Sequence, residues 1–340
     1  MKKLPSLLVA NLIFFGFSCQ EQLDPRVSAR LNSHLPYLSF DSDDKFEAVT
    51  NMVAAMTDEE LDVWEQEQGF LSYRSVFRQA MQEWQNVESP ADLSKFLAKY
   101  DDIVTVVDSV LRPHIDIRLY QGIVNREGVY ETNGFLHKIV GDEIMTVAKA
   151  DAEKLNSISH NAELTPKESG VRAYRYRSRP VEKEARVNST CTTHMTASYF
   201  HNESNCRHDR RVYMSARSYV VLSTNTTGDY RQPRVEIKVW GTLRTGTWCN
   251  WKQYSTTLAY RNVSFSIMAW ADQGGIAIPQ SYSRVLPDYA PAEDRWDLPW
   301  DQPIGDRVHN QVIYPSPFTN FHGEATSRGA HGVWVILDCL

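Results

Sequence analysis

Residues 234–243 read RVEIKVWGTL, and this stretch decides the fold class. Polar and apolar side chains alternate from Arg234 to Val239, which is the period of a β-strand with one face in a core. Short runs rich in Val, Tyr, Thr and Trp recur through the C-terminal half with turns between them. These runs are VRAYRYRS (171–178), RRVYMSARSYVVL (210–222), TTLAYRNVSFSIMAW (256–270) and HGVWVILDC (331–339). The pattern predicts an antiparallel β sandwich or barrel-like domain over residues 171–340.

The N-terminal half has a helical pattern instead. Thr57-Asp58-Glu59-Glu60 has the spacing of a helix capping box, and Ser89-Pro90 is typical of another helix start. Within residues 69–84, aromatic and apolar side chains recur at steps of three and four, as on one buried helix face. We therefore predict a helical unit over residues 39–150 that ends in a small β hairpin or meander, and an α+β fold class overall. The acidic side chains of these helices lie mainly opposite the apolar stripes, which predicts solvated faces.

Residues 151–170 are polar, contain Pro166 and Gly170, and are interpreted as a linker. Helices and strands do not alternate after it, which argues against a Rossmann-like or TIM-barrel enzyme. GTLRTG (241–246) lacks the Gly-Lys-Ser/Thr ending of a phosphate-binding loop. We predict no cofactor.

The N-terminus has the features of an export signal. Lys2 and Lys3 precede an apolar run from Leu7 to Phe17, whose length of about 11 residues is well below the roughly 20 that a spanning helix needs. Cys19 follows directly after Ser18, as in a bacterial lipobox. We predict a lipoprotein signal peptide over residues 1–18, an acylated Cys19 that anchors the protein to a membrane, and a polar tether over 19–38. The alternative is an ordinary secretory signal in which Cys19 occurs by chance.

Four further cysteines lie in the C-terminal half: Cys191, Cys206, Cys249 and Cys339. An even number outside the cytosol predicts two disulfides, with three possible connectivities. The local choice joins Cys191 to Cys206 and leaves Cys249 to join Cys339. A zinc site with a nearby histidine is the alternative, but the spacings do not match a zinc finger. We predict no metal.

Charge is distributed unevenly along the chain. The net charge is −6, but residues 38–110 hold sixteen acidic against five basic side chains, and residues 171–220 hold ten basic against four acidic ones. This asymmetry indicates either that the two parts dock on each other or that a basic surface faces a ligand. The sequence pI of about 5.9 and the absence of a reader motif argue against nucleic acid as a partner.

Tryptophans gather near the C-terminus, since seven of the nine lie from Trp240 onward. Four of them are candidate ligand-binding residues: Trp248, Trp251, Trp296 and Trp300. The last two lie in LPDYAPAEDRWDLPWDQPIGD (286–306), a stretch with four prolines inside the longer loop 281–311. It is interpreted as an irregular loop, whose aromatic and acidic side chains suit a carbohydrate or a peptide. The alternative is that Trp296 and Trp300 fold back and close the edge of the β domain.

Residues 321–334 read FHGEATSRGAHGVW and place His322 two residues before Glu324. On an extended chain these side chains share one face, as metal ligands or catalytic groups would. No third ligand can be named from the spacing, so the closing hairpin of the fold is the favoured interpretation. No nucleophile elbow, His-Glu-x-x-His or Cys/His protease motif is present. We predict no catalytic residue; a secreted hydrolase with a site in the 281–311 loop or near His322 and Glu324 stays an alternative.

Two stretches carry a family resemblance. FEAVTNMVAAMTDEELDVWEQEQGFLSYRSVF (46–77) and IVNREGVYETNGFLHKIVGDEIMTV (123–147) are similar to a group of uncharacterised Bacteroidetes surface lipoproteins, as are HGEATSRG (322–329) and the terminal Cys339. The resemblance implies an outer-membrane lipoprotein that is surface-exposed or periplasmic, and it implies no chemistry. We predict a binding or interaction protein for a glycan, a peptide or host matrix. The other alternative is a structural subunit of a surface assembly.

Overall fold

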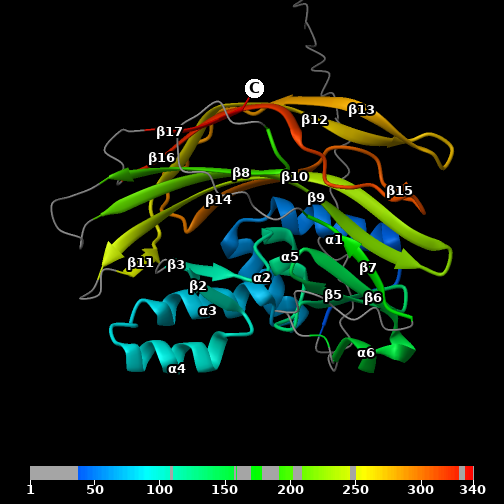
Figure 1. Cartoon of the computed structure of the whole chain (residues 1–340), viewed down its shortest axis with the longest axis horizontal. Helices are drawn as coiled ribbons and strands as arrows, with labels where there is room; N and C mark the ends of the chain where they lie inside the picture. The colour runs from blue at the N-terminus through cyan, green and yellow to red at the C-terminus, as the bar shows by residue number, and fades with distance from the viewer. Residues whose placement is uncertain are drawn as a thin grey trace, which may run out of the picture.

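The computed structural model describes residues 37–107, 110–156, 158, 170–177, 191–201, 209–245, 250–328 and 334–339. These residues form three layers (Figure 1). One antiparallel sheet lies outermost, a second lies in the middle, and the helices with a smaller sheet lie on the other side. The helical part comes first in the chain and antiparallel sheets dominate the rest, so the α+β prediction is confirmed.

The helices of the N-terminal part begin where their capping residues predict. The capping box at Thr57 forms, because the Thr57 hydroxyl accepts from the Glu60 amide (3.2 Å) and the Glu60 carboxylate accepts from the Thr57 amide (2.7 Å). Pro90 opens the last of these helices, as expected. No helix in the described ranges is long and apolar enough to cross a membrane. The bounds are α1 (Asp43–Ala55), α2 (Asp58–Gln68), α3 (Tyr73–Trp84) and α4 (Pro90–Tyr100).

The predicted meander also forms. After a hairpin of β2 (Val104–Val107) and β3 (Val110–Pro113) and the helix α5 (Arg118–Ile123), three antiparallel strands follow. The turn between the first two contains Asn133 and Gly134 at φ 49° and 81°, a left-handed pair that such residues adopt at low cost. The sheet consists of β4 (Val129–Thr132), β5 (Phe135–Val140) and β6 (Glu143–Ala148), with β1 (Ser39–Phe40) beside β4 and β7 (Arg172–Arg175) beside β6.

The predicted linker begins with short helices, η1 (Lys149–Asp151) and α6 (Glu153–Asn156). Residues 157 and 159–169 lie outside the described part of the chain.

The middle sheet is built around the alternating stretch that opens the C-terminal pattern. Val235, Ile237 and Val239 face the outer sheet and are fully buried there. The alternate side chains face the helices, and Arg234 and Glu236 among them are also buried, at 1% and 0% exposure. The strands are β8 (His194–His201), β9 (Arg210–Asn225), β10 (Gly228–Thr245), β11 (Asn250–Gln253), β14 (Asp297–Pro303) and β15 (Val308–His309).

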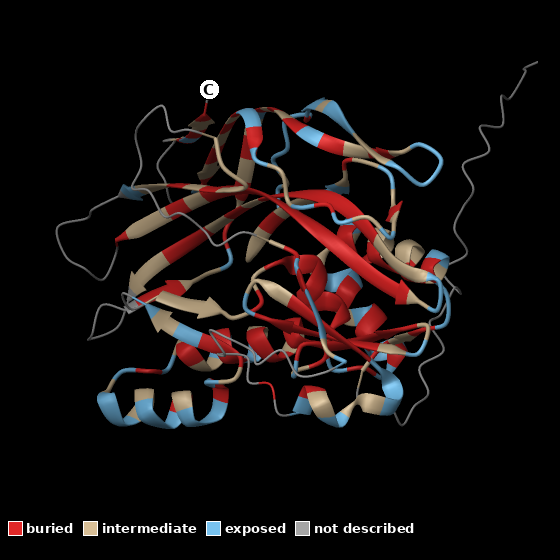
Figure 2. Ribbon diagram, turned by 45° about the vertical axis from the view of Figure 1, so that its right-hand side comes forward, coloured by how far each residue is buried: buried red, intermediate tan, exposed pale blue. Residues whose placement is uncertain are grey.

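The outer sheet packs its inner face on the middle sheet. Phe265, Phe318 and Phe321 lie in the core between the two sheets, with ring centroids 5.5–6.4 Å apart. Its outer face carries more exposed side chains, as the paler strands at the top of Figure 2 show. The strand order is β13 (Ala277–Val285), β12 (Leu258–Asp272), β16 (Phe318–Ser327) and β17 (Val335–Cys339).

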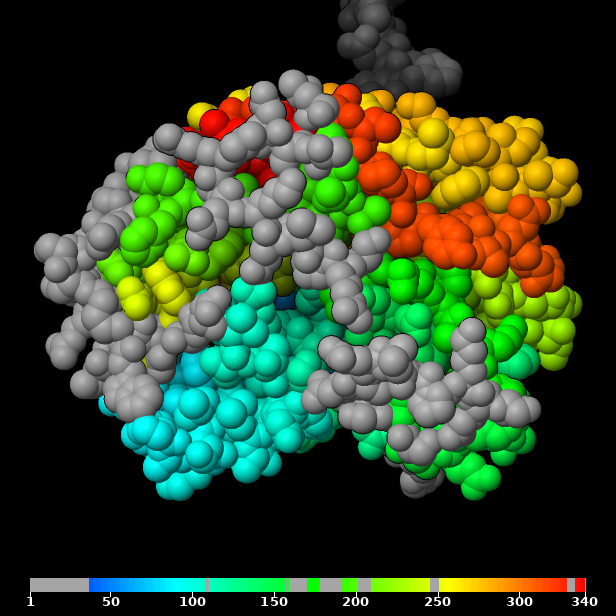
Figure 3. Space-filling view, viewed as in Figure 1, coloured from blue at the N-terminus to red at the C-terminus, as the bar shows by residue number. Residues whose placement is uncertain are grey.

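The helical layer and the middle sheet share one hydrophobic core. Side chains of β9 around Val220 belong to the same buried cluster as those of α1, α3 and α5. Tyr120 and Tyr130 donate from their hydroxyls to the backbone carbonyls of Val220 (3.0 Å) and Leu222 (2.7 Å). In the space-filling view the cyan helices α3 and α4 lie at the lower left and the orange and yellow strands at the upper right (Figure 3).

The structure corrects the interpretation of residues 286–306 as an irregular loop. Their second half forms β14, which pairs antiparallel with β10 from Asp297 to Pro303. Pro299 and Pro303 made a strand hard to predict from the sequence, because proline lacks a backbone donor and occurs in sheets mainly on edge strands. Among the described residues β14 pairs with β10 alone, so it tolerates residues that lack an N–H donor.

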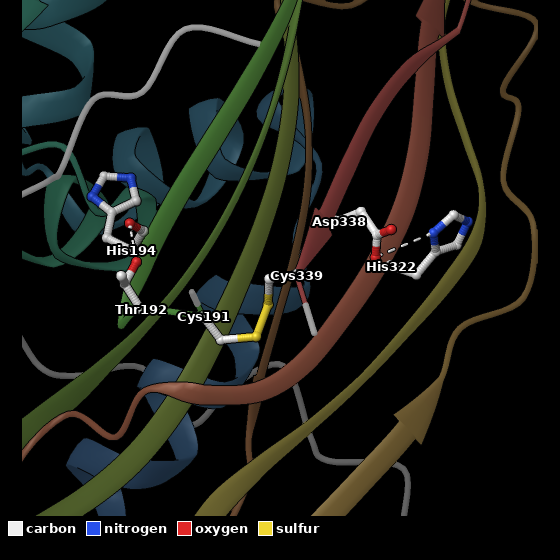
Figure 4. Close-up of a disulfide and its surroundings, with 6 residues drawn as sticks. All are labelled: Cys191, Thr192, His194, His322, Asp338 and Cys339. Carbon is white, nitrogen blue, oxygen red and sulfur yellow. Dashed lines mark hydrogen bonds and ion pairs between the residues drawn. A yellow bond between two sulfur atoms is a disulfide. The ribbon is translucent and has the colours of Figure 1, made fainter. Parts of the chain in front are cut away.

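The disulfide pairing predicted from proximity in sequence is also wrong. Cys191 joins Cys339, 148 residues away, with a Cα–Cα distance of 5.2 Å. The reason is that the chain entering β8 lies against β17, so a distant cysteine is the nearer one in space (Figure 4). The bond therefore links the middle sheet to the outer sheet. Cys206 and Cys249 lie outside the described residues.

Candidate functional site

A pocket of about 240 Å³ opens between the helical layer and the segment that enters β14. One wall is the junction between α1 and α2, and the opposite wall is residues 294–299. Tyr260 of β12 and Tyr289 complete the rim. The pocket thus joins the part of the chain that carries the acidic helices to the Pro- and Trp-containing segment that the sequence singles out.

The α1–α2 junction places a carboxylate at the pocket. Met56 is extended (φ −70°, ψ 144°), so α1 ends at Ala55, and Thr57 caps the next helix one residue later. Asp58 becomes the first residue of α2, where the helix N-terminus favours a negative charge. Its Oδ1 lies 3.2 Å from both Arg74 Nη1 and Arg118 Nη2. Two guanidiniums therefore hold this carboxylate in place.

Arg118 connects the helices to the middle sheet. It is the first residue of α5 and 4% exposed. Its backbone N–H donates to Glu236 Oε1 (3.0 Å) on β10, and its Nη2 also donates to the Met56 carbonyl (2.9 Å). Burial raises the pKa of Glu236, although the Arg217 guanidinium at 2.5 Å opposes the shift. Arg118 Nε has no hydrogen-bond partner among the described residues.

Asp297 supplies the facing carboxylate. It begins β14 and projects to the same face of the sheet as Lys238, whose Nζ lies 2.7 Å from Asp297 Oδ2. Burial alone would raise the pKa of Asp297, but Lys238 and Arg118 together lower it, so the group is ionised at neutral pH. Asp297 Oδ1 is buried and has no partner within the described part of the chain. Arg295 Nε, of a third lining residue, is also buried without one, so the lining residues hold two buried donors and one buried acceptor that a water or a ligand could satisfy.

Aromatic rings form the outer rim. Tyr260 and Tyr289 lie with ring centroids 5.9 Å apart, and Tyr289 is 42% exposed. Backbone bridges between these two residues, and between Thr256 and Arg295, hold the segment before β14 along β12. Trp296 lines the pocket from the same segment, and its carbonyl accepts from Gln253 Nε2 (2.8 Å). The rim is thus fixed to two sheets before any ligand binds.

The three candidate tryptophans within the described residues do not form one platform. Trp296 lines the pocket, whereas Trp300 packs into the core between the sheets, with its ring centroid 5.9 Å from that of Phe265. Trp251 is 7% exposed, with the Arg211 guanidinium 4.7 Å from its ring centroid. Trp248 lies outside the described residues. The binding interpretation therefore fits Trp296, and the alternative of closing the β domain fits Trp300.

His322 and Glu324, the pair near the C-terminus, have a further acidic group beside them, Asp338, which sequence spacing did not reveal. His322 lies 3.7 Å from Glu324 on its own strand and 3.7 Å from Asp338, which is opposite it on β17. Asp338 and Cys339 are consecutive, so His322 and Asp338 lie on the other side of β17 from the disulfide (Figure 4). Glu324 is already bound, at 2.8 Å by Arg261 and at 2.9 Å by Asn262. The described residues contain no group of three His, Cys, Asp or Glu side chains that would hold a metal.

The basic stretch of the sequence faces acidic groups within the protein. Arg177 pairs with Asp116 and with Asp142 (3.3 Å), and Arg217 pairs with Asp116 (2.9 Å) and Glu236. Of the two explanations for the charge asymmetry, docking between the two parts accounts for these residues. Residues 178–190 lie outside the described chain.

Some carboxylates that the sequence places on solvated helix faces are in fact buried. Glu65 is 4% exposed and accepts from Arg74 Nε at 3.0 Å, and the side chain of Asp58 is only 18% exposed. The expectation is wrong because Glu65 lies on the buried face of α2 with Leu61 and Trp64. Asp58, at the start of the helix, is covered by Arg74 and Arg118. Asp58 and Arg118 lie 60 residues apart, and no local pattern signals their contact. The sequence marked Asp297 only as one of several acidic residues in a proline-containing segment, with no signal for its contacts.

No family model matches the chain, and no curated protein matches it. Among solved structures, a DUF4848 family protein from Bacteroides thetaiotaomicron aligns with it at 14% identity and a TM-score of 0.28. The alignment covers 89% of this chain and 96% of that one. A likeness this weak carries no inference about shared fold or activity, so the resemblance to Bacteroidetes surface lipoproteins stays a prediction.

Proposed function

We propose that this protein is an extracytoplasmic lipoprotein that binds a small, uncharged saccharide in the pocket between α2 and β14. The observation that carries the proposal is a set of unsatisfied groups on lining residues, with Arg118 Nε and Arg295 Nε as donors and Asp297 Oδ1 as acceptor. A sugar hydroxyl both donates and accepts, so the hydroxyls of one ring suit a lining that offers both donors and an acceptor.

The lining favours a ligand without strong charge. Four carboxylates and three guanidiniums line the pocket, so their charges nearly cancel. The rim rings of Tyr289 and Trp296 suit the C–H face of a sugar. The volume of about 240 Å³ is below the roughly 300–1,000 Å³ typical of drug-sized ligands, so one sugar ring is the appropriate scale.

Hydrolysis is the second candidate, because two carboxylates, Asp58 and Asp297, line the same pocket. Glycoside hydrolysis needs one carboxyl group that stays protonated as general acid. Lys238 and Arg118 lower the pKa of Asp297, so it does not stay protonated. Asp58 accepts hydrogen bonds from the guanidiniums of Arg74 and Arg118, which stabilise its ionised form. These contacts favour binding over proton transfer.

The structural-subunit alternative needs a strand edge that can accept another chain. β13 is at the edge of the outer sheet, with β12 as its neighbour within the described residues. Pro279 interrupts that edge by removing a backbone donor, which is how proteins discourage edge pairing. We therefore rank this alternative below the other two.

The test is a saccharide titration with matched variants. The purified protein is screened by ligand-observed NMR against neutral mono- and disaccharides, and any binder is quantified by calorimetry. Tyr289→Ala should weaken binding by about tenfold or more, since it removes an exposed stacking ring of the rim. Tyr314→Ala, at another exposed tyrosine that does not line the pocket, is the control and should bind normally.

Three results would count against the proposal. Binding of no neutral saccharide, or equal loss in both tyrosine variants, would remove the pocket as a sugar site. Release of reducing sugar by the wild type, abolished by Asp58→Asn or Asp297→Asn, would favour the hydrolase instead.

A further inference from the structure

A second cluster lies at one end of the middle sheet, across the neighbouring strands β8, β9, β10 and β11, to the left in Figure 1. Arg211 is its centre. The Arg211 guanidinium carbon lies 4.7 Å from the ring centroid of Trp251, 5.4 Å from that of Phe200 and 5.8 Å from that of Tyr213. Phe200 is 39% exposed, so the cluster reaches the surface.

Arg211 differs from the other arginines on this face of the sheet. Arg217 and Arg234 each pair with a carboxylate, at 2.5 Å and 2.9 Å. Arg211 donates from Nη1 to the hydroxyl of Tyr213 (3.2 Å), and no carboxylate pairs with it among the described residues. Arg244 adds a second guanidinium 5.5 Å from the Trp251 ring and pairs with Asp209 at 3.4 Å.

Unsatisfied polar atoms converge at the same place. Thr242 lies directly opposite Arg211 in the β9–β10 register, so both side chains project to one face. Thr242 is 3% exposed, and its hydroxyl has no hydrogen-bond partner within the described chain. Arg211 Nε is likewise buried without one. Buried donors of this kind are normally satisfied, and here two of them without a partner in the described ranges lie on directly opposed residues.

We propose that this cluster, Arg211 with Thr242 and the rings of Phe200, Tyr213 and Trp251, binds the carboxylate or sulfate group of an acidic saccharide. A guanidinium whose faces rest on rings keeps the N–H groups at its edge free to donate to an oxyanion. The aromatic rings beside it suit the sugar that carries the oxyanion. The site does not depend on the pocket at Arg118 and Asp297.

Bulk electrostatics would not produce this binding, because the protein carries a net charge of −6. A polyanion is repelled by the molecule as a whole, so its retention needs a local site. The test uses a heparin hexasaccharide for sulfate and a galacturonic acid trisaccharide for carboxylate, each titrated by calorimetry at about 50 mM salt.

Arg211→Gln removes the cation and should weaken the better of the two ligands by at least about tenfold. Arg284→Gln is the matched control, because Arg284 is exposed on β13 and the same charge is lost there. Thr242→Val keeps the shape of a buried side chain while removing its hydroxyl, and should weaken binding by several fold. Thermal melting checks that each variant is folded; if Arg211→Gln is not, Thr242→Val carries the comparison.

Four results would overturn the proposal. They are binding of neither oligosaccharide by the wild type, equal losses in Arg211→Gln and Arg284→Gln, full binding by a folded Thr242→Val, and equal affinity for free inorganic sulfate. Retention on anionic phospholipid vesicles without oligosaccharide binding would assign the cluster to a lipid headgroup and would equally refute it.

Discussion

Lowering the pH should destabilise this protein well before its carboxylates titrate, because of His137. The His137 ring is 0% exposed and stacks on Tyr130 with ring centroids 4.6 Å apart. Thr132 donates its hydroxyl to the Thr224 carbonyl (3.0 Å), so that hydroxyl must accept from His137 Nε2–H (2.8 Å). Nδ1 then accepts from Thr146 (3.0 Å). The site is built for the neutral imidazole, and burial lowers the pKa of His137 to about 3.

The sign of the effect follows from proton linkage. The native pKa lies below the unfolded value of about 6.5, so the unfolded state binds the proton first. The stabilising contribution is complete above pH 6.5 and is lost as the pH falls towards about 3. Each pH unit in that window costs about 1.4 kcal/mol, which gives about 2 kcal/mol at pH 5 from His137 alone. His194, whose pKa is lowered to about 3 by burial and by Arg217, acts in the same direction.

Urea unfolding at pH 7, 6 and 5, followed by circular dichroism, measures the free energy of unfolding directly. His137→Gln lacks the titrating group, so its loss between about pH 7 and 5 should be smaller than that of the wild type by about 2 kcal/mol. Equal losses in the two proteins, or a wild type that gains stability on acidification, would refute the reasoning.

Two further predictions concern covalent chemistry. Breaking the Cys191–Cys339 bond by Cys339→Ser should lower the free energy of unfolding by up to about 5 kcal/mol, since the bond closes a loop of 148 residues. Peptide mapping without reductant should show the Cys191–Cys339 link and no free thiol at Cys206 or Cys249; a Cys191–Cys206 peptide would contradict the structure. Cys19→Ala should move the protein from the membrane fraction to the soluble one, and unchanged membrane retention would contradict the lipoprotein proposal.

Local patterns in the sequence were sufficient for the elements they encode. The Thr57 capping box, the stripe of α3 and the alternation in β10 all predicted structure that forms, because each depends on residues only a few positions apart. The fold class followed from the same signals.

Long-range contacts were not predictable in this way. Alternation in β10 does not reveal that its polar face is buried under helices, where Arg234 binds Asp301 and Arg217 binds Glu236. The disulfide partner and β14 depend on which segments meet in space. The sequence indicated one wall of the pocket, through Trp296. The other wall, with Asp58 and Arg118, forms only when two distant parts of the chain pack together.

The central claim, a saccharide site between α2 and β14, is tested most directly by hydrogen–deuterium exchange with and without a bound neutral saccharide. We expect added protection in residues 54–59 and 294–299, the segments that form the two pocket walls, and at Tyr289. Protection at other segments only, or no protection at saturating ligand, would contradict the claim.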